Sequence, residues 1–186
     1  VDPAGILAVT FTNKAAKEMK ERIEHLCGTG RFPDLGTFHS VCSRWLRADG
    51  SRVGLAPQFA IYATAEQLIV MKEVIKEAGL DEKKFTPRSL LSTVSNWKNQ
   101  MVTVAMALQK AGNAFERHLA ELYANYDKKL RLNQAVDFDD ILLMTVQLFR
   151  DHPELLAEYQ ERIRYILIDE YQDVNAVQYE RVRLLS

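Results

Sequence analysis

The sequence predicts an α/β protein in which a partial parallel sheet is interrupted by an all-helical insertion. Two short apolar runs, at residues 6–11 and 165–168, have the β-branched character of strands, and polar residues follow each of them at once. In the middle of the chain the strand signals largely vanish and helical periodicity takes over. Strands separated by helices are typical of a parallel sheet whose carboxyl edge faces the ligand. We therefore expect a discontinuous α/β domain over residues 1–56 and 136–186, and a helical subdomain over residues 57–135.

The composition is that of a globular protein. Hydrophobic residues make up 47% of the 186 residues, which is enough for a sizeable core. No apolar run approaches the ~20 residues that cross a bilayer, and the first residues lack the basic-then-apolar build of a signal peptide. Cys27 and Cys42 form no CxxC motif or paired framework, which suits a reducing compartment. We expect a cytoplasmic protein without membrane contact.

The net charge of −1 conceals a division along the chain. Residues 11–52 carry 8 Lys and Arg against 5 Asp and Glu, whereas residues 137–186 carry 5 against 11. Such segregation suits contact with a polyanion in one region and metal–phosphate chemistry in the other. For the middle of the chain, an ordinary solvated surface is the simpler interpretation.

The first strand is predicted by the run ILAVTF, and Thr12 or Asn13 supplies the N-cap of an amphipathic helix behind it. Strand, polar turn and helix form half of a βαβ unit, with residues Thr10 to Lys14 at the ligand-facing strand end, among them Phe11, Thr12 and Asn13. An aromatic ring offers sequence-tolerant stacking to bases, while hydroxyl, amide and ammonium groups hold a phosphate backbone. The alternative is that this segment only caps the helix.

A second step from a short apolar segment into a helix occurs at LGTFHSVCSRWL. Thr37 or Ser40 is able to cap that helix, and Thr37, His39 and Ser40 then lie beyond the strand end. His39 and Cys42 have the spacing of metal ligands but lack two further ligands. A lone histidine is more often a hydrogen-bonded structural residue than a ligand.

The run Tyr165–Ile168 predicts a fully buried strand, which Asp169 and Glu170 follow directly. Buried charge is costly unless it is paired or bound to a metal, so we expect both carboxylates to face the ligand crevice at the sheet edge. Asp169 would hold Mg²⁺, which prefers oxygen ligands and keeps waters beside its phosphates. Glu170 could orient or deprotonate an attacking water. Alternatively, both residues cap the helix that starts near Asn175.

Three segments in this order, AVTFTNKAAKEM, GTFHS and LIDEYQDVNAVQYE, resemble conserved segments of superfamily 1 DNA helicases of the UvrD/Rep kind. The resemblance implies a partial RecA-like sheet of the P-loop NTPase class and the use of ATP with Mg²⁺. It implies that Asp169 is the metal ligand, that Glu170 and Gln172 are catalytic, and that both carboxylates contact the nucleotide. It further implies contacts with single-stranded DNA from Phe11, Thr12, Asn13, Lys14, Thr37, His39 and Ser40.

Helical signals dominate the middle of the chain. Thr64 with Gln67 suggests a capping box, the pair Thr86-Pro87 opens a second helix, and residues 115–130 define a longer third one. In the resemblance this insertion lies beside the DNA, so four cations are candidates for duplex phosphates, namely Lys83, Lys84, Arg88 and Lys98.

Three clustered carboxylates, Asp137, Asp139 and Asp140, suit a helix N-terminus, because negative charge there meets the positive end of the helix dipole. Phe138 is expected to point inward. Capping explains the carboxylates, so we leave them out of the active site.

The phosphate-gripping loop GxxxxGK[ST] occurs nowhere in this sequence, although a Walker B carboxylate needs it to position nucleotide. We therefore expect an interior piece of a larger helicase, inactive and nucleotide-free by itself, whose incomplete sheet pairs with a second copy. The whole protein would translocate on single-stranded DNA and unwind duplex junctions in repair or replication, together with proteins of those processes. Two alternatives stay open: a helicase subunit of a helicase–nuclease complex, and a non-catalytic nucleic-acid-binding module.

Overall fold

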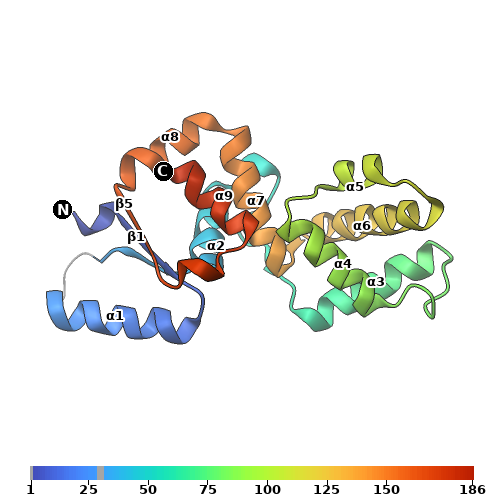
Figure 1. Ribbon diagram of the computed structural model, residues 1–186, viewed down its shortest axis with the longest axis horizontal. Coiled ribbons are helices and arrows are strands. Elements are labelled where there is room, and N and C mark those ends of the chain that lie inside the picture. The colour runs from blue at the N-terminus through green and yellow to red at the C-terminus, as the bar shows by residue number, and fades with distance from the viewer. Residues whose placement is uncertain (1, 29–31) are drawn as a thin grey trace. The chain divides into compact units, whose positions relative to one another are not determined.

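The structure is a computed structural model that describes residues 2–28 and 32–186. The chain folds into two compact units (Figure 1). Unit 1 consists of Val1–Pro57 with Met144–Ser186, and unit 2 of Gln58–Leu143. Among the described residues, no helix combines the length and the apolar character that crossing a bilayer requires.

Unit 1 is an α/β unit built on a three-stranded parallel sheet in the order β2-β1-β5. Helix α1 lies on one side of this sheet and α2 on the other (Figure 1). This arrangement confirms the predicted α/β class with a partial parallel sheet. The elements of the unit are β1 (Ile6–Thr10), α1 (Asn13–Cys27), β2 (Asp34–Thr37), α2 (Phe38–Asp49), α8 (Pro153–Arg162), β5 (Tyr165–Ile168) and α9 (Ala176–Leu185), with 3-10 turns at Pro3–Gly5, Gly50–Val53 and Tyr171–Asp173.

The register of the sheet determines which side chains meet. Thr10 of β1 is paired with Thr37 of β2, and Val9 of β1 with Ile168 of β5. Because all three strands are parallel, their carboxyl ends lie at one edge. We call this edge, with the residues that directly follow the strands, the carboxyl edge. It comprises Thr10–Lys14, Thr37–Ser40 and Asp169–Gln172.

Three aromatic side chains meet in the core of unit 1. The rings of Trp45, Phe149 and Tyr159 lie with centroids 5.0–5.7 Å apart in tilted or edge-on geometry. Such pairs add about 0.5–1.5 kcal/mol each beyond the area that they bury. The Tyr159 hydroxyl donates a hydrogen bond to Asp49 at 2.8 Å, so the polar atom of the aromatic cluster has a hydrogen-bond partner. This core fixes α2 behind the carboxyl edge.

Strand β5 forms where the sequence predicts it, but the expectation of full burial is wrong. Tyr165 is 52% exposed and Leu167 is 59% exposed, whereas Ile166 and Ile168 are partly buried. In the described sheet β5 is an outer strand, so alternate side chains of its apolar run face solvent. An uninterrupted apolar run therefore misled the prediction, since it does not distinguish an outer strand from a central one.

Unit 2 is helical, and a two-residue parallel strand pair joins its two ends. Its elements are β3 (Ala60–Ile61), α3 (Thr64–Glu77), α4 (Pro87–Asn99), α5 (Val104–Lys110), α6 (Ala114–Leu132), β4 (Ala135–Val136) and the start of α7 (Phe138–Asp151), which continues into unit 1. Its core is one cluster of buried residues from these helices: Val70, Met71, Val74, Ile75, Phe85, Leu90, Val94, Ala107, Ala120, Leu122, Tyr123, Tyr126, Leu130 and Ala135.

The helix starts of unit 2 agree only in part with those that the sequence predicts. Thr86 caps α4 with Pro87 in its first turn, as predicted. The capping box at Thr64 is wrong, because Ala63 occupies the N-cap and the Gln67 side chain donates to the Tyr62 carbonyl instead. Helix α5 was not predicted, since its seven residues bury one side chain and leave almost no periodicity. Phe138, which was expected to face inward, is more than half exposed, and so is Phe115 near the start of α6.

A buried ion cluster extends unit 2 beyond the expected end at residue 135. Lys98 Nζ of α4 lies 2.6 Å from Asp137 Oδ2 and 2.8 Å from Asp140 Oδ1, and the Tyr126 hydroxyl donates to Asp137 at 3.2 Å. The cluster ties the first turn of α7 to α4. Because Lys98 is 1% exposed, the expectation that it meets duplex phosphates is wrong.

Candidate functional site

Asp169 stands directly beyond β5 and is held by the end of β1. Its backbone N–H donates to the Val9 carbonyl at 3.0 Å, and the Thr10 hydroxyl donates to Asp169 Oδ2 at 3.3 Å. Thr10 is buried while the Asp169 side chain is exposed. The carboxylate is thus anchored on one oxygen and open to solvent at the carboxyl edge. Thr10 was expected at the ligand-facing strand end, but its contact with Asp169 was not predicted.

The surroundings of Asp169 fit a shared metal shell. Mg²⁺ is usually bound through one or two carboxylates and completes its octahedron with waters and phosphate oxygens. Within the part of the chain that the structure describes, no three His, Cys, Asp or Glu side chains are grouped to hold a metal ion by themselves. A solvent-facing carboxylate with a free oxygen can supply one position of such a shell.

Glu170 adopts an uncommon backbone conformation. Its φ of 54° and ψ of 48° lie in the left-handed region, which costs a non-glycine residue about 1 kcal/mol or more. The Asp173 N–H donates to the Glu170 carbonyl at 2.9 Å, which closes the turn. The Gln172 side-chain amide donates to the Glu170 carboxylate. The two predicted catalytic side chains are therefore in direct contact on an exposed turn.

The alternative role of Asp169 and Glu170 as caps of the last helix is wrong. Asn175 occupies that N-cap itself, and its side chain accepts from the Gln178 N–H at 2.9 Å. The Gln178 side chain accepts from the Asn175 N–H at 3.0 Å and completes a capping box. The acidic pair is not needed to start α9.

The residues after β1 fall into two groups. The Phe11 ring, partly buried, meets the Phe38 ring with centroids 5.5 Å apart and planes at 54°. Thr12 caps α1, because its hydroxyl oxygen accepts from the Ala15 N–H at 3.1 Å. Asn13 is the first residue of α1 and is exposed. The capping explanation thus holds for Thr12 but leaves Phe11 and Asn13 available at the edge.

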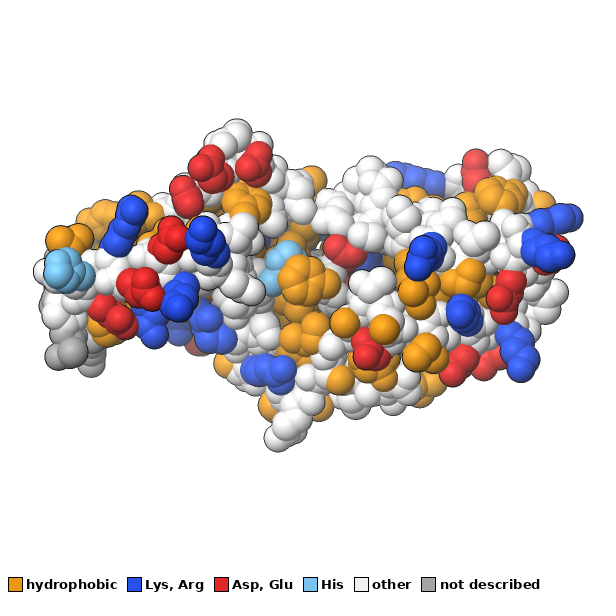
Figure 2. All heavy atoms as spheres, turned by 90° about the horizontal axis from the view of Figure 1, so that it is seen from below, with side chains coloured by type: hydrophobic (Ala, Val, Ile, Leu, Met, Phe, Trp, Pro, Cys, Tyr) orange, Lys and Arg blue, Asp and Glu red, His pale blue; other side chains and the backbone are white. Residues whose placement is uncertain are grey.

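The outer surface of α1 is close to electrically neutral. Lys14, whose side chain is 87% exposed, lies 3.9 Å from Glu18, and two further pairs of the same spacing follow along the helix. Figure 2 shows the basic and acidic side chains interspersed over this part of the surface. Exposed pairs of this kind contribute little, about 0–1 kcal/mol each. The Lys14 ammonium therefore remains free to exchange Glu18 for another anion.

Thr37 is nearly buried and caps α2, since its hydroxyl oxygen accepts from the Ser40 N–H at 3.2 Å. The Ser40 hydroxyl donates to the Thr37 carbonyl at 2.9 Å. His39 is partly buried between them in sequence, in the first turn of α2. Of the three predicted contacts, His39 and Ser40 have side-chain surface at the carboxyl edge, while Thr37 mainly shapes the turn.

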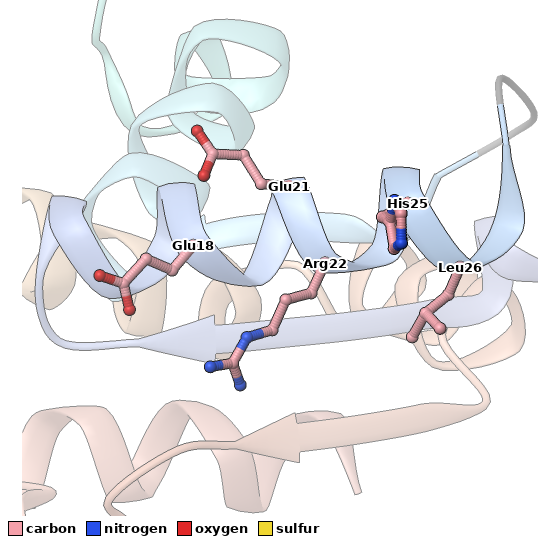
Figure 3. Close-up of a pocket in the computed structure, with 5 residues that line it drawn as sticks. All are labelled: Glu18, Glu21, Arg22, His25 and Leu26. Carbon is pink, nitrogen blue, oxygen red and sulfur yellow. The ribbon is translucent and has the colours of Figure 1, made fainter.

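Two hollows lie beside α1. An apolar groove of about 680 Å³ runs between α1 and β5, with Met19 and Leu167 in its wall and Asp169 at its end. A shallower hollow on α1 itself is lined by Glu18, Glu21, Arg22, His25 and Leu26 (Figure 3). In that view Arg22 and Glu18 extend to one side of the helix and Glu21 to the other. No predicted site residue lies in the shallower hollow.

A parallel sheet with an acidic pair after one strand, and aromatic and polar groups after its neighbours at the same edge, defines the class of protein: a partial RecA-like helicase domain. Sequence comparison agrees. The family model described as the UvrD/REP helicase N-terminal domain matches residues 1–186. The chain belongs to this family.

Named relatives are bacterial helicases. The chain is 47% identical over 187 residues to the "ATP-dependent DNA helicase PcrA" of Bacillus subtilis (strain 168), covering 100% of this chain and 25% of that protein. Proteins of the same name from Staphylococcus epidermidis and Staphylococcus aureus are 44% and 43% identical, each covered to 26%. The chain thus spans about a quarter of the length of these relatives.

Proposed function

We propose that this chain is part of the first motor domain of an ATP-dependent DNA helicase that moves along single-stranded DNA and unwinds duplex at a junction. The observation that carries the proposal is the register of the sheet, which puts Asp169 and Phe11 after neighbouring paired strands. The Thr10–Asp169 hydrogen bond links the two strand ends directly. Roles in repair or replication, partner proteins from those processes and a cytoplasmic location are parts of the proposal.

Each group of side chains has a separate task. Asp169 would hold the Mg²⁺ of bound ATP, which supplies charge neutralisation of the phosphates. Glu170 would accept a proton from the attacking water. Gln172 donates to the Glu170 carboxylate and would hold that carboxylate, and with it the water, in position. Phe11 would stack on a base, while Asn13, Lys14, His39 and Ser40 would hold the phosphate backbone, with Thr12 and Thr37 shaping the two turns.

A turnover experiment tests the catalytic assignment in the longer protein of which we propose this chain to be a part. Glu170→Gln should retain ATP binding and nearly abolish DNA-stimulated hydrolysis, because an amide cannot accept the proton from water. Asp173→Asn, in the same exposed turn, is the matched control and should leave turnover unchanged. Turnover of Glu170→Gln close to that of the wild type would refute the assignment.

A non-catalytic nucleic-acid-binding module is the second candidate, favoured by the lack of a GxxxxGK[ST] loop in this sequence. We propose that the 186-residue chain alone neither binds nor hydrolyses ATP. Equilibrium binding of a fluorescent ATP analogue to the chain, and to the longer protein, separates the candidates. Binding by neither would favour the module.

We also propose that the chain by itself pairs with a second copy along β5, whose outer side has no partner strand in the described sheet. Exposed apolar side chains on such a strand favour pairing between molecules. Sedimentation velocity of the wild type should show a dimer, and Leu167→Lys should restore the monomer, because charge on an outer strand opposes pairing. A wild type that is monomeric over the accessible concentration range would contradict this.

A further inference from the structure

Arg181 is a charged residue buried in the core of unit 1. It lies on α9, is 1% exposed, and forms no salt bridge with a carboxylate in the described part of the chain. Its Nε and Nη2 atoms are buried without a hydrogen-bond partner. A buried unpaired charge normally costs several kcal/mol, roughly the scale of a whole domain's stability. Such an exception calls for a physical explanation.

The Arg181 guanidinium contacts aromatic rings and hydrogen-bond acceptors of α2. The guanidinium carbon lies 4.9 Å from the centroid of the Phe38 ring and 5.0 Å from that of Trp45. Nη1 donates to the Phe38 carbonyl at 3.2 Å and to Cys42 Sγ at 2.9 Å. Attraction between a desolvated cation and two aromatic faces offsets part of the cost of burial. The guanidinium thus contacts both the ring and the backbone carbonyl of Phe38.

Phe38 is also the neighbour of Phe11, at a centroid distance of 5.5 Å. A continuous set of contacts therefore runs from Arg181 through Phe38 to Phe11, all within unit 1. Helix α9, which carries Arg181, follows the turn of Glu170 with only a few residues between. Arg181 thus connects the helix after the acidic turn to Phe38, which follows β2, and through Phe38 to Phe11, which follows β1.

We propose that Arg181 is a positioning residue for the nucleic-acid track: it holds Phe38, and through Phe38 it sets the orientation of the Phe11 ring for stacking on a base. The inference rests on the proposed function and deepens it. A flat, rigid guanidinium suits this task better than an aliphatic side chain, because it combines a ring contact with a backbone hydrogen bond. A Phe38 ring that is free to move would no longer fix the orientation of the Phe11 ring that it contacts.

The test uses the longer protein and compares Arg181→Met with Arg183→Met. Methionine fills similar volume, and replacing a buried charge by an apolar side chain is often neutral or stabilising. We expect Arg181→Met to fold, to keep its DNA-independent ATPase, and to need about tenfold more single-stranded DNA for half-maximal stimulation. Arg183 is exposed and two residues further along α9, so Arg183→Met should leave the DNA requirement unchanged.

A double-mutant cycle shows whether Arg181 acts through Phe11. In a Phe11→Leu background, Arg181→Met should add no further loss, because the ring that it orients is gone. Arg181→Lys keeps the charge and should show a smaller loss of DNA stimulation than Arg181→Met. If the methionine variant fails to fold, the lysine variant provides the test. Unchanged stimulation in a folded Arg181→Met or Arg181→Lys variant, or additive losses in the cycle, would overturn the inference. A wild type that DNA does not stimulate at all would instead overturn the proposed function.

Discussion

Removal of the Lys98 ammonium gives the sharpest test of the energetics of unit 2. Lys98 lies between two buried carboxylates, and its pKa is raised because the charges of Asp140 and Asp137 outweigh the effect of burial. Lys98→Met should leave those carboxylates without their main counter-ion. Breaking a buried pair on one side costs about 3–5 kcal/mol. Arg131 remains 3.7 Å from Asp140 and offsets part of the loss, so we expect about 3 kcal/mol at pH 7.5.

The loss should depend on pH in a defined direction. Burial and the charge of Asp140 raise the pKa of Asp137 to about 6, and Lys98 opposes both. The pKa of Asp140 is lowered, because Lys98 and Arg131 together outweigh its burial. Because Lys98 no longer opposes burial, we expect the carboxylate pair of the native variant to keep, above pH 6, a proton that the native wild type has lost. The variant should therefore regain about 1.4 kcal/mol per pH unit on acidification to pH 6, or about 2 kcal/mol in total from pH 7.5.

Urea unfolding followed by Trp97 fluorescence measures this effect in unit 2. The Trp97 and Tyr123 rings lie with their centroids 5.7 Å apart, so Trp97 reports on the packing of unit 2. A Trp45→Phe background removes the other tryptophan of the sequence, so that the fluorescence comes from Trp97 alone. Lys129→Met is the matched control. Lys129 pairs with Glu73 and Glu77, which are exposed, so this variant should lose no more than about 1 kcal/mol of stability. Equal midpoints for the two variants, or a difference that does not change with pH, would refute the reasoning.

Three further outcomes are expected. Glu180 is buried and accepts hydrogen bonds from Arg183 and Arg150, which lower the pKa of its carboxyl group to about 2. The stability that the ionised carboxylate gives to the fold is complete above about pH 4.5 and is lost as the pH falls toward 2. Glu180→Gln should thus reduce the free energy of unfolding by about 2 kcal/mol at pH 7 and leave little difference from the wild type near pH 2, by urea titration at both values. Thr37→Ala removes the cap of α2 and should lower stability by about 1 kcal/mol, with Thr37→Ser as the control that restores it. Glu170→Gly should be about 1 kcal/mol more stable than Glu170→Ala in thermal unfolding, since both lose the carboxylate and glycine alone is relaxed at φ 54°; equal midpoints would show that the turn is unstrained.

The sequence predicted the elements of unit 1 well because strand, polar turn and helix follow one another with clear punctuation. Thr12 and Thr37 cap α1 and α2; the sequence had narrowed the two caps to Thr12 or Asn13 and to Thr37 or Ser40. The juxtaposition of Asp169 with Thr10 follows from parallel pairing and could be expected once both strands were identified. The roles of these residues in catalysis and DNA contact remain predictions.

What the sequence did not predict depends on contacts distant in the chain. Lys98 has the local pattern of a surface cation, and its carboxylate partner Asp137 is 39 positions away. Arg181 likewise stands on a helix rich in charge, and only the fold brings it against Phe38, 143 positions earlier. Exposure of β5 is a property of the sheet order, which no local pattern records. Burial of charge and strand position are thus tertiary properties.

The parallel pair β3–β4 has a consequence for the history of the fold. Ala60 is paired with Ala135 and Ile61 with Val136, so the two chain ends of the helical unit are held one strand spacing apart, about 4.8 Å. Whatever lies between residues 62 and 134 begins and finishes at the same point in space. Helices could therefore be gained, lost or exchanged there without any change in the register of the α/β sheet of unit 1.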